Sequence, residues 1–210
     1  MSILPIDDEL ELLHSRQYEV HIYQLSDDEL VARGVVSDVK PPGLYVADDP
    51  DPLEVHQMQL ELRITASDLT IRDAGVIFET HPHSICPLIA RDYKALIGVS
   101  IARGFNREVR QLFGGERGCT HTNALLQAMA PAVIQARWST VAKDARAKDP
   151  DSEPLDNLSR KKQIAANVNT CHVWAEDSEY VAGVLDGSQD TPPVIPIRER
   201  LLKLGRDPLS

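Results

Sequence analysis

The most reactive side chains in this sequence gather in short boxes. One box, Gly118-Cys119-Thr120-His121, stands where a loop pattern gives way to the longest helical pattern of the chain. The first backbone N–H groups of a helix have no partner within it, and with the helix dipole they favour an anion and a thiolate. The box is therefore a candidate for a reactive thiol, for one end of a metal site, or for binding a substrate carboxylate or phosphate.

The same box also has a purely structural interpretation. Thr120 can cap the helix, Cys119 can be a small buried residue, and His121 can lie on the surface. Box composition alone does not separate the two interpretations.

Further histidines and cysteines occur in two more boxes. The run from His81 to Cys86 follows the last predicted strand, and Cys171-His172 ends a predicted helix. Such side chains are the ligands that zinc prefers. A zinc-type site would use Cys86, Cys119, His121 and Cys171 or His172. The spacing matches no standard zinc motif and contains no Cys-x-x-Cys pair, so a metal is an alternative hypothesis.

Two candidates lie on predicted strands. Asp38 closes the second strand, a position suited to a general base or to orienting a histidine, although turns after strands also favour Asp for backbone reasons. His56 falls on the apolar face of its strand. The candidate catalytic residues are His121, Cys119, His56 and Asp38. The candidate ligand-binding residues are Gly118, Thr120, Arg63, Cys86 and His172.

These residues need a sheet and helices to position them. Apolar and polar residues alternate most clearly over residues 56–65, and similar patterns cover 18–25, 30–36 and 69–80. The connections are too short for crossover helices except the Pro-rich segment 40–52, which is predicted to be a loop. The pattern predicts a four-stranded antiparallel meander.

After Pro87 the apolar period becomes helical. Helices are predicted over residues 88–97, from Asn106 as cap, from the Cys119 box onwards, and over 158–171. Pro131 is predicted to kink or restart the long helix near Ala130. The fold class is thus α+β, with an antiparallel β-meander in the N-terminal half packed against C-terminal helices.

The expected organisation is one α+β domain over residues 14–175, with strands at about 17–80 and helices at about 88–174. Residues 1–13 form an N-terminal extension. Residues 176–210 form a C-terminal extension, expected to be partly disordered or to dock on a partner subunit, which would make the protein a homo-oligomer.

The charge and composition of the chain disfavour several classes of function. The formal net charge of −10 disfavours nucleic-acid binding. A signal peptide and an apolar run long enough for a membrane helix are both missing, so we expect a cytoplasmic protein without membrane contact. The three cysteines are widely spaced and odd in number, which indicates reduced thiols. The G-x-G-x-x-G, Walker and G-x-S-x-G patterns are missing, so no nucleotide cofactor is indicated.

An ordered set of segments resembles a known family. The set runs from residues 16–40 through His56-Gln57-Met58, then residues 71–74, Cys86, the Cys119 box and finally residues 170–172. It resembles the bacterial family catalogued as domain of unknown function 2889, over about residues 14–175. The resemblance implies no particular activity. It implies that the seven residues Asp38, His56, Cys86, Cys119, His121, Cys171 and His172 belong to one pattern.

The chain departs from that family in the polar insertion around residues 149–155 and in the extension after Gly183. Three functions stay open. The first is an enzyme acting by acid–base chemistry on a small carboxylate-bearing metabolite, with His121 or His56 as the acid or base. The second is a zinc-type metal-dependent enzyme. The third is a non-catalytic ligand-binding or assembly module.

Overall fold

The chain forms two compact units in a computed structural model, which describes residues 9–102, 104–148, 157–189 and 193–207. One unit ends at Trp138 and the other begins at Ser139. The predicted domain over residues 14–175 includes the whole first unit from residue 14 and the beginning of the second, and its C-terminal bound stays a prediction. The helix that crosses the boundary is continuous.

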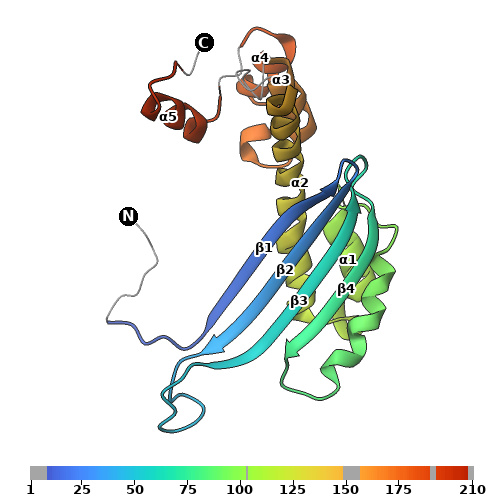
Figure 1. The fold of residues 1–210 in the computed structure, drawn as a ribbon, viewed down its shortest axis with the longest axis vertical. Coiled ribbons are helices and arrows are strands. Elements are labelled where there is room, and N and C mark those ends of the chain that lie inside the picture. Colours follow the sequence, from blue (N-terminus) through green and yellow to red (C-terminus); the bar gives the residue numbers. More distant parts are fainter. Residues whose placement is uncertain (1–8, 103, 149–156, 190–192, 208–210) are drawn as a thin grey trace. The chain divides into compact units, whose positions relative to one another are not determined.

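The first unit is built on a four-stranded antiparallel sheet (Figure 1). Its strands are β1 (Ser15–Ser26), β2 (Glu29–Lys40), β3 (Leu53–Thr65) and β4 (Ile71–Thr80), in the order β1-β2-β3-β4. The predicted meander and the α+β class are therefore confirmed. Because neighbouring strands are antiparallel, the start of β1, the end of β2, the start of β3 and the end of β4 share one end of the sheet.

The period-two alternation of the strands decides which sheet face is buried. Val36 of β2 lies opposite Met58 of β3, which lies opposite Phe78 of β4, and all three belong to the core. The residues between them, such as Val35, Gln59 and Ile77, face the other way and are at least partly exposed. We call these the core face and the outer face of the sheet.

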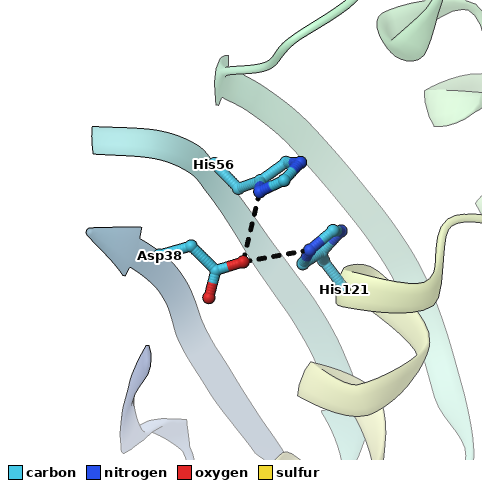
Figure 2. A group of neighbouring side chains, drawn as sticks. All are labelled: Asp38, His56 and His121. Atoms are coloured by element: carbon cyan, nitrogen blue, oxygen red, sulfur yellow. Dashed lines mark ion pairs between the residues drawn. The ribbon is translucent and has the colours of Figure 1, made fainter. Parts of the chain in front are cut away.

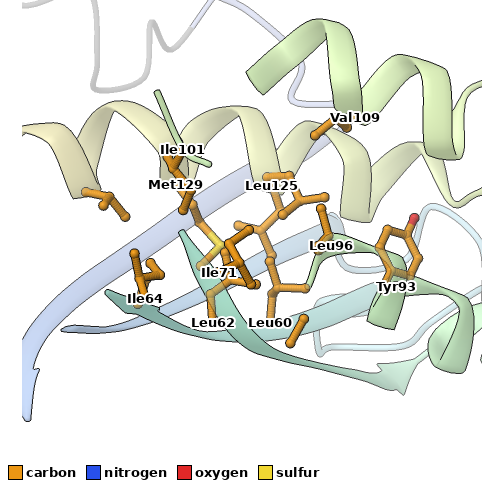
Figure 3. Close-up of a cluster of buried hydrophobic side chains, with 14 of the residues drawn as sticks. Leu60, Leu62, Ile64, Ile71, Tyr93, Leu96, Ile101, Val109, Leu125 and Met129 are labelled. Carbon is orange, nitrogen blue, oxygen red and sulfur yellow. The ribbon is translucent and has the colours of Figure 1, made fainter. Parts of the chain in front are cut away.

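Helices cover the core face (Figure 3). They are the 3₁₀ helix η1 (Cys86–Leu96), α1 (Phe105–Phe113), the short η2 (Gly115–Arg117) and the long α2 (Thr120–Lys148). Leu125 and Met129 of α2 are fully buried against the sheet, as is Tyr93 of η1. Burying such side chains stabilises the unit by about 1.5–3 kcal/mol each.

One glycine permits the close approach of α2 to the sheet. A Cβ atom on Gly34 of β2 would lie 2.7 Å from the Met129 sulfur and 3.0 Å from a methyl carbon of Leu125. A Gly34→Ala exchange should therefore overpack the core and lower the free energy of unfolding by about 1–3 kcal/mol in urea titrations. Gly75 of β4 has nothing within 4 Å of its Cβ position, so Gly75→Ala is the matched control. Equal stability of the two variants would contradict this packing.

The helices differ from expectation in three places. Residues 88–97 were expected on one apolar stripe, but the segment is a 3₁₀ helix with Leu88 exposed. Helix α1 begins at Phe105 after Gly104, whose φ of 92° suits glycine, and not after an Asn106 cap. The predicted restart at Pro131 is wrong, because α2 continues through it. Met129 and Val133 are both fully buried, and their packing holds the helix together despite the missing N–H donor.

The second unit is helical. It contains the end of α2, α3 (Asn157–Asn167), η3 (His172–Trp174), α4 (Glu179–Asp186) and α5 (Ile195–Lys203). The helix predicted over 158–171 thus ends at Asn167, and the C-terminal extension carries α4 and α5. The predicted insertion at 149–155 lies outside the described residues. Across the ranges described, no helix combines the length and apolar character needed to cross a membrane.

Candidate functional site

The centre of the candidate site is the carboxylate of Asp38. Only 2 % of this side chain is exposed, although it is charged, and burying a charge is costly unless partners surround it. Asp38 lies at the end of β2 on the core face. Figure 2 shows two histidine rings from separate elements, His56 and His121, directed at one of its oxygens.

The other carboxylate contacts come from β1 and the residue just before it. Arg16 lies directly opposite Asp38 in the sheet and donates two hydrogen bonds, from Nε to Oδ1 at 2.6 Å and from Nη2 to Oδ2 at 2.7 Å. His14, two residues earlier, places its Nε2 3.3 Å from Oδ1. A paired, forked contact of this kind is the strongest that an arginine makes to a carboxylate. It fixes the orientation of the Asp38 side chain.

His56 approaches Asp38 from β3 at a break in the strand pairing. His56 lies opposite Asp38, but the next pair is Val39 with Glu54, so Val55 is an extra residue on β3. Such bulges redirect side chains and are frequent beside functional sites. The Nδ1 atom of His56 lies 3.1 Å from Asp38 Oδ2, yet it is buried and makes no aligned hydrogen bond within the described part of the chain.

His121 approaches the same oxygen from the first turn of α2. Its Nε2 lies 3.1 Å from Asp38 Oδ2, and its ring stacks on that of His56 with centres 4.0 Å apart. The other ring nitrogen, Nδ1, lies 3.7 Å from the sulfur of Cys119, which is within hydrogen-bond range for sulfur. His121 therefore lies between a buried carboxylate and a thiol.

A hydrogen-bond clamp holds the start of α2 in place. The backbone N–H of Cys119 donates to the Tyr93 hydroxyl at 2.9 Å, and that hydroxyl donates to Asn123 Oδ1 at 2.9 Å. Asn123 in turn donates to the carbonyl of Phe113 at 2.7 Å. Burial raises the pKa of Tyr93 to about 12, so the hydroxyl stays a donor at all physiological pH values.

The loop before Cys119 is equally constrained. A Cβ atom on Gly118 would lie 2.5 Å from the carbonyl oxygen of Phe113, so only glycine fits this close approach. The positions of Cys119 and His121 are thus set by packing on one side and by the Tyr93 clamp on the other.

The charges of the site follow from these contacts. The hydrogen bonds from Arg16 lower the pKa of Asp38 to about 2, against the opposing effect of burial. The same pair raises the pKa of Arg16. Burial lowers the pKa of His121 below 6.5, and the neighbouring His56 and Arg16 lower it further, while Asp38 raises it. At pH 7 Asp38 is therefore ionised, Arg16 is charged and His121 is neutral.

The structure brings together the four residues proposed as catalytic: Asp38, His56, His121 and Cys119. Gly118 and Thr120 flank Cys119 in the chain. Two further candidates lie elsewhere in this unit. Cys86 packs against the hydrophobic core, and Arg63 lies on the outer face, paired with Glu29 at 2.7 Å.

The proposed metal ligands are divided between the two units. Cys171 and His172 belong to the second unit, and Cys171 is an exposed free cysteine. Of the residues that the structure describes, three form a group able to hold a metal ion: Asp38, His56 and His121, whose ligand atoms lie within 4.8 Å of one another. This group shares His121 with the predicted zinc-type set, which stays a prediction.

Sequence reasoning missed His14 as a site residue. The available signal was its spacing from Arg16, because residues two apart on a strand share a face. His14 lies one position before β1 begins, where the alternation of that strand is not yet visible.

A hollow of about 430 Å³ lies away from this cluster. Arg33, Gln59, Glu61 and Ile77 are among its lining residues, and they belong to the outer face. Its charged lining residues are already paired, since Arg33 donates to Glu61 at 2.7 Å. The chemistry of the unit is therefore concentrated on the core face at Asp38.

Fold and site together define a class of α+β protein. Its antiparallel meander carries a buried carboxylate that is paired with an arginine and contacted by one histidine from a strand and one from a helix. The chain belongs to the family described as a protein of unknown function, DUF2889, whose model matches residues 14–135. That match covers the sheet, η1, α1 and the start of α2. It also includes Asp38, the four residues that contact its carboxylate, and Cys119. No curated protein and no solved structure matches the chain.

Proposed function

We propose that the first unit is an enzyme acting on a small molecule, with His121 as its general base. The observation that carries the proposal is the position of His121, with one nitrogen 3.1 Å from the Asp38 carboxylate and the other 3.7 Å from the Cys119 sulfur. A base held by an ionised group and facing a second reactive group is the arrangement that acid–base catalysis needs.

The ionised Asp38 selects the useful tautomer of His121. An ionised carboxylate only accepts hydrogen bonds, so the ring proton of neutral His121 belongs on Nε2, which faces Asp38 Oδ2. The lone pair then lies on Nδ1, which faces Cys119. Because burial keeps the pKa of His121 below 6.5, this nitrogen is able to accept a proton at pH 7.

The substrate class that the site favours is a small molecule with a carboxylate or a derivative of one. Arg16 is already occupied by Asp38, so it is not the main anchor for a substrate. The start of α2 offers backbone N–H groups and the positive end of the helix dipole next to His121. A carboxylate oxygen, or the oxygen of an ester or thioester carbonyl, is suited to that position.

The test is turnover of a defined panel. Small carboxylic acids, their methyl esters and their thioesters are incubated with the full chain and followed by proton NMR. We expect at least one compound to be converted by the wild type and not by His121→Asn. His21 of the outer face, which pairs with Glu19, is the matched control site for His21→Asn. Conversion that persists unchanged in His121→Asn contradicts the proposal.

A metal-dependent enzyme is the second candidate, because one observation favours it. His56 Nδ1 is buried without a hydrogen bond and shares Asp38 Oδ2 with His121 Nε2, so three ligand atoms converge. Two histidines and one carboxylate are a known metal-binding set.

Two geometric facts rank the metal below acid–base catalysis. Both Asp38 oxygens accept from the charged Arg16, which repels a cation. Imidazoles bound to one metal at about 2.1 Å and at right or tetrahedral angles hold their ring centres roughly 4.6–5.3 Å apart, whereas these centres are 4.0 Å apart. Elemental analysis of protein purified without chelator decides between the candidates. About one metal ion per chain, lost in His56→Ala, would favour the metal enzyme.

A further inference from the structure

We propose that Cys119 is a covalent nucleophile, and that the substrates are esters or thioesters whose acyl group it accepts. The inference rests on the proposed function, because it needs His121 as the base. It adds a reaction class, acyl transfer or hydrolysis, and names the attacking atom.

Three neighbouring side chains supply a nucleophile, a base and a group that orients the base. The Cys119 sulfur lies 3.7 Å from His121 Nδ1, and His121 Nε2 lies 3.1 Å from Asp38 Oδ2. An activated thiol is recognised by this set of roles and not by sequence order. The sulfur–nitrogen distance is somewhat long, as is common before a substrate binds.

The Cys119 thiol is held in a fixed position beside its base. Cys119 is half-buried, and the loop that carries it is fixed by Gly118 and by the Tyr93 clamp on its backbone N–H. Cys86 is equally half-buried and both thiols pack against the hydrophobic cluster, but Cys119 has His121 Nδ1 3.7 Å from its sulfur. Cys119 is therefore the thiol that can be deprotonated by a neighbouring base.

The start of α2 also provides groups for the oxyanion. Asn123 N–H donates to the Cys119 carbonyl at 2.9 Å, which is the ordinary helical bond of that turn. The N–H groups that precede Asn123 in a helix start have no such helical partner. N–H groups next to an attacking atom stabilise the negative oxygen of a tetrahedral intermediate.

The reaction then balances without an oxidant or a second reagent. The Cys119 thiol gives its proton to His121 Nδ1 while the sulfur bonds to the carbonyl carbon. The bond from that carbon to the leaving oxygen or sulfur breaks, and the leaving group takes the proton from His121. Water next attacks the Cys119 thioester and gives a proton to His121. The carbon–sulfur bond breaks, a carboxylic acid leaves, and the proton returns to the thiol.

The test uses p-nitrophenyl acetate as the probe and the full chain as the enzyme. We expect release of p-nitrophenolate with transient acetylation of Cys119, located by peptide mass spectrometry after acid quench. Cys119→Ala should lower the buffer-corrected rate by at least about 100-fold. His21→Asn, which removes an exposed histidine of the outer face, should leave the rate unchanged. Circular dichroism and urea titration establish that each variant is folded.

A second measurement needs no variant. Limited alkylation of the wild type with iodoacetamide at pH 7, resolved by peptide, should modify Cys119 at least about tenfold faster than Cys171. Slower reaction of Cys119, or acetylation at another residue, overturns the nucleophile. If Cys119→Ala retains turnover of the probe while His121→Asn loses it, the proposed function stands without a covalent step. If both variants retain turnover, both proposals fail.

Discussion

Replacing His121 with asparagine should slow the turnover of any substrate of this site by about 10²–10⁴-fold, the usual contribution of a positioned general base. Asparagine keeps a polar side chain at the start of α2 but cannot take up a proton. The variant should stay folded, because His121 is partly exposed and is not part of the hydrophobic core. Initial rates of the wild type, His121→Asn and His21→Asn are the measurement.

The pH profile of the wild type gives the same test a second readout. The base works only when it is deprotonated, so the rate falls as pH falls through the pKa of His121. Because burial, His56 and Arg16 lower that pKa, the fall should be centred below pH 6.5. A profile centred above pH 6.5, or a rate equal to wild type in His121→Asn, would exclude His121 as the base.

Replacing Asp38 with asparagine should lower the free energy of unfolding at pH 7 by about 2–3 kcal/mol. The carboxylate is buried and accepts two hydrogen bonds from Arg16, so the neutral amide leaves the guanidinium without its charge partner. The expected loss lies below the range of about 3–5 kcal/mol for broken, fully buried pairs, because Arg16 is 36 % exposed and stays partly hydrated.

The stabilising effect of Asp38 also has a defined pH dependence. Its pKa is about 2 in the folded chain, below the ordinary value of 3.8, so the effect is complete above pH 3.8 and disappears as pH falls through 2. About half of the difference between wild type and Asp38→Asn should be gone at pH 3.

Urea titrations at pH 7 and pH 3 measure this difference. The matched control is Glu61→Gln, which breaks the exposed Arg33–Glu61 pair on the outer face and should change stability by no more than about 0.5 kcal/mol. Equal effects of Asp38→Asn and Glu61→Gln would show that Asp38 does not hold the site together.

Part of this site was predictable from local pattern. His56 falls on the apolar face of an alternating strand, and Asp38 near the end of its strand was a candidate for orienting a histidine. The hairpin between β1 and β2 closes at Asp27-Asp28, and an extra residue at Leu25 shifts the register by one position, which puts Arg16 opposite Asp38. In a hairpin, the length of the turn limits which residues of the two strands can pair.

The meeting of Asp38 with the two histidines was not predictable in the same way. The β2–β3 connection spans residues 41–52, and a loop of that length leaves the register open. The extra residue at Val55 shifts that register by one more position. His121 reaches Asp38 because Gly34 allows α2 to pack closely on the sheet. This packing depends on a three-dimensional fit that the periodicity of the sequence does not reveal.

The candidate metal ligands show what residue type alone does not predict. Cys86, Cys119, His121 and Cys171 share suitable ligand chemistry, but composition does not say which unit each residue joins. Cys171 belongs to the second unit, whereas Cys86 and Cys119 both pack against the core of the first. Ligand type is visible in a sequence, whereas convergence depends on long-range contacts.

The central claim is that burial keeps His121 neutral at pH 7, while Asp38 holds the ring proton on Nε2 and leaves the lone pair on Nδ1 toward Cys119. Ring-nitrogen NMR of the histidine-labelled full chain tests this directly, with the His121 signals assigned by their loss in His121→Asn. The account predicts a neutral ring at pH 7, a proton on Nε2, and a pKa below 6.5. A charged ring at pH 7, or a neutral ring with its proton on Nδ1, would contradict it.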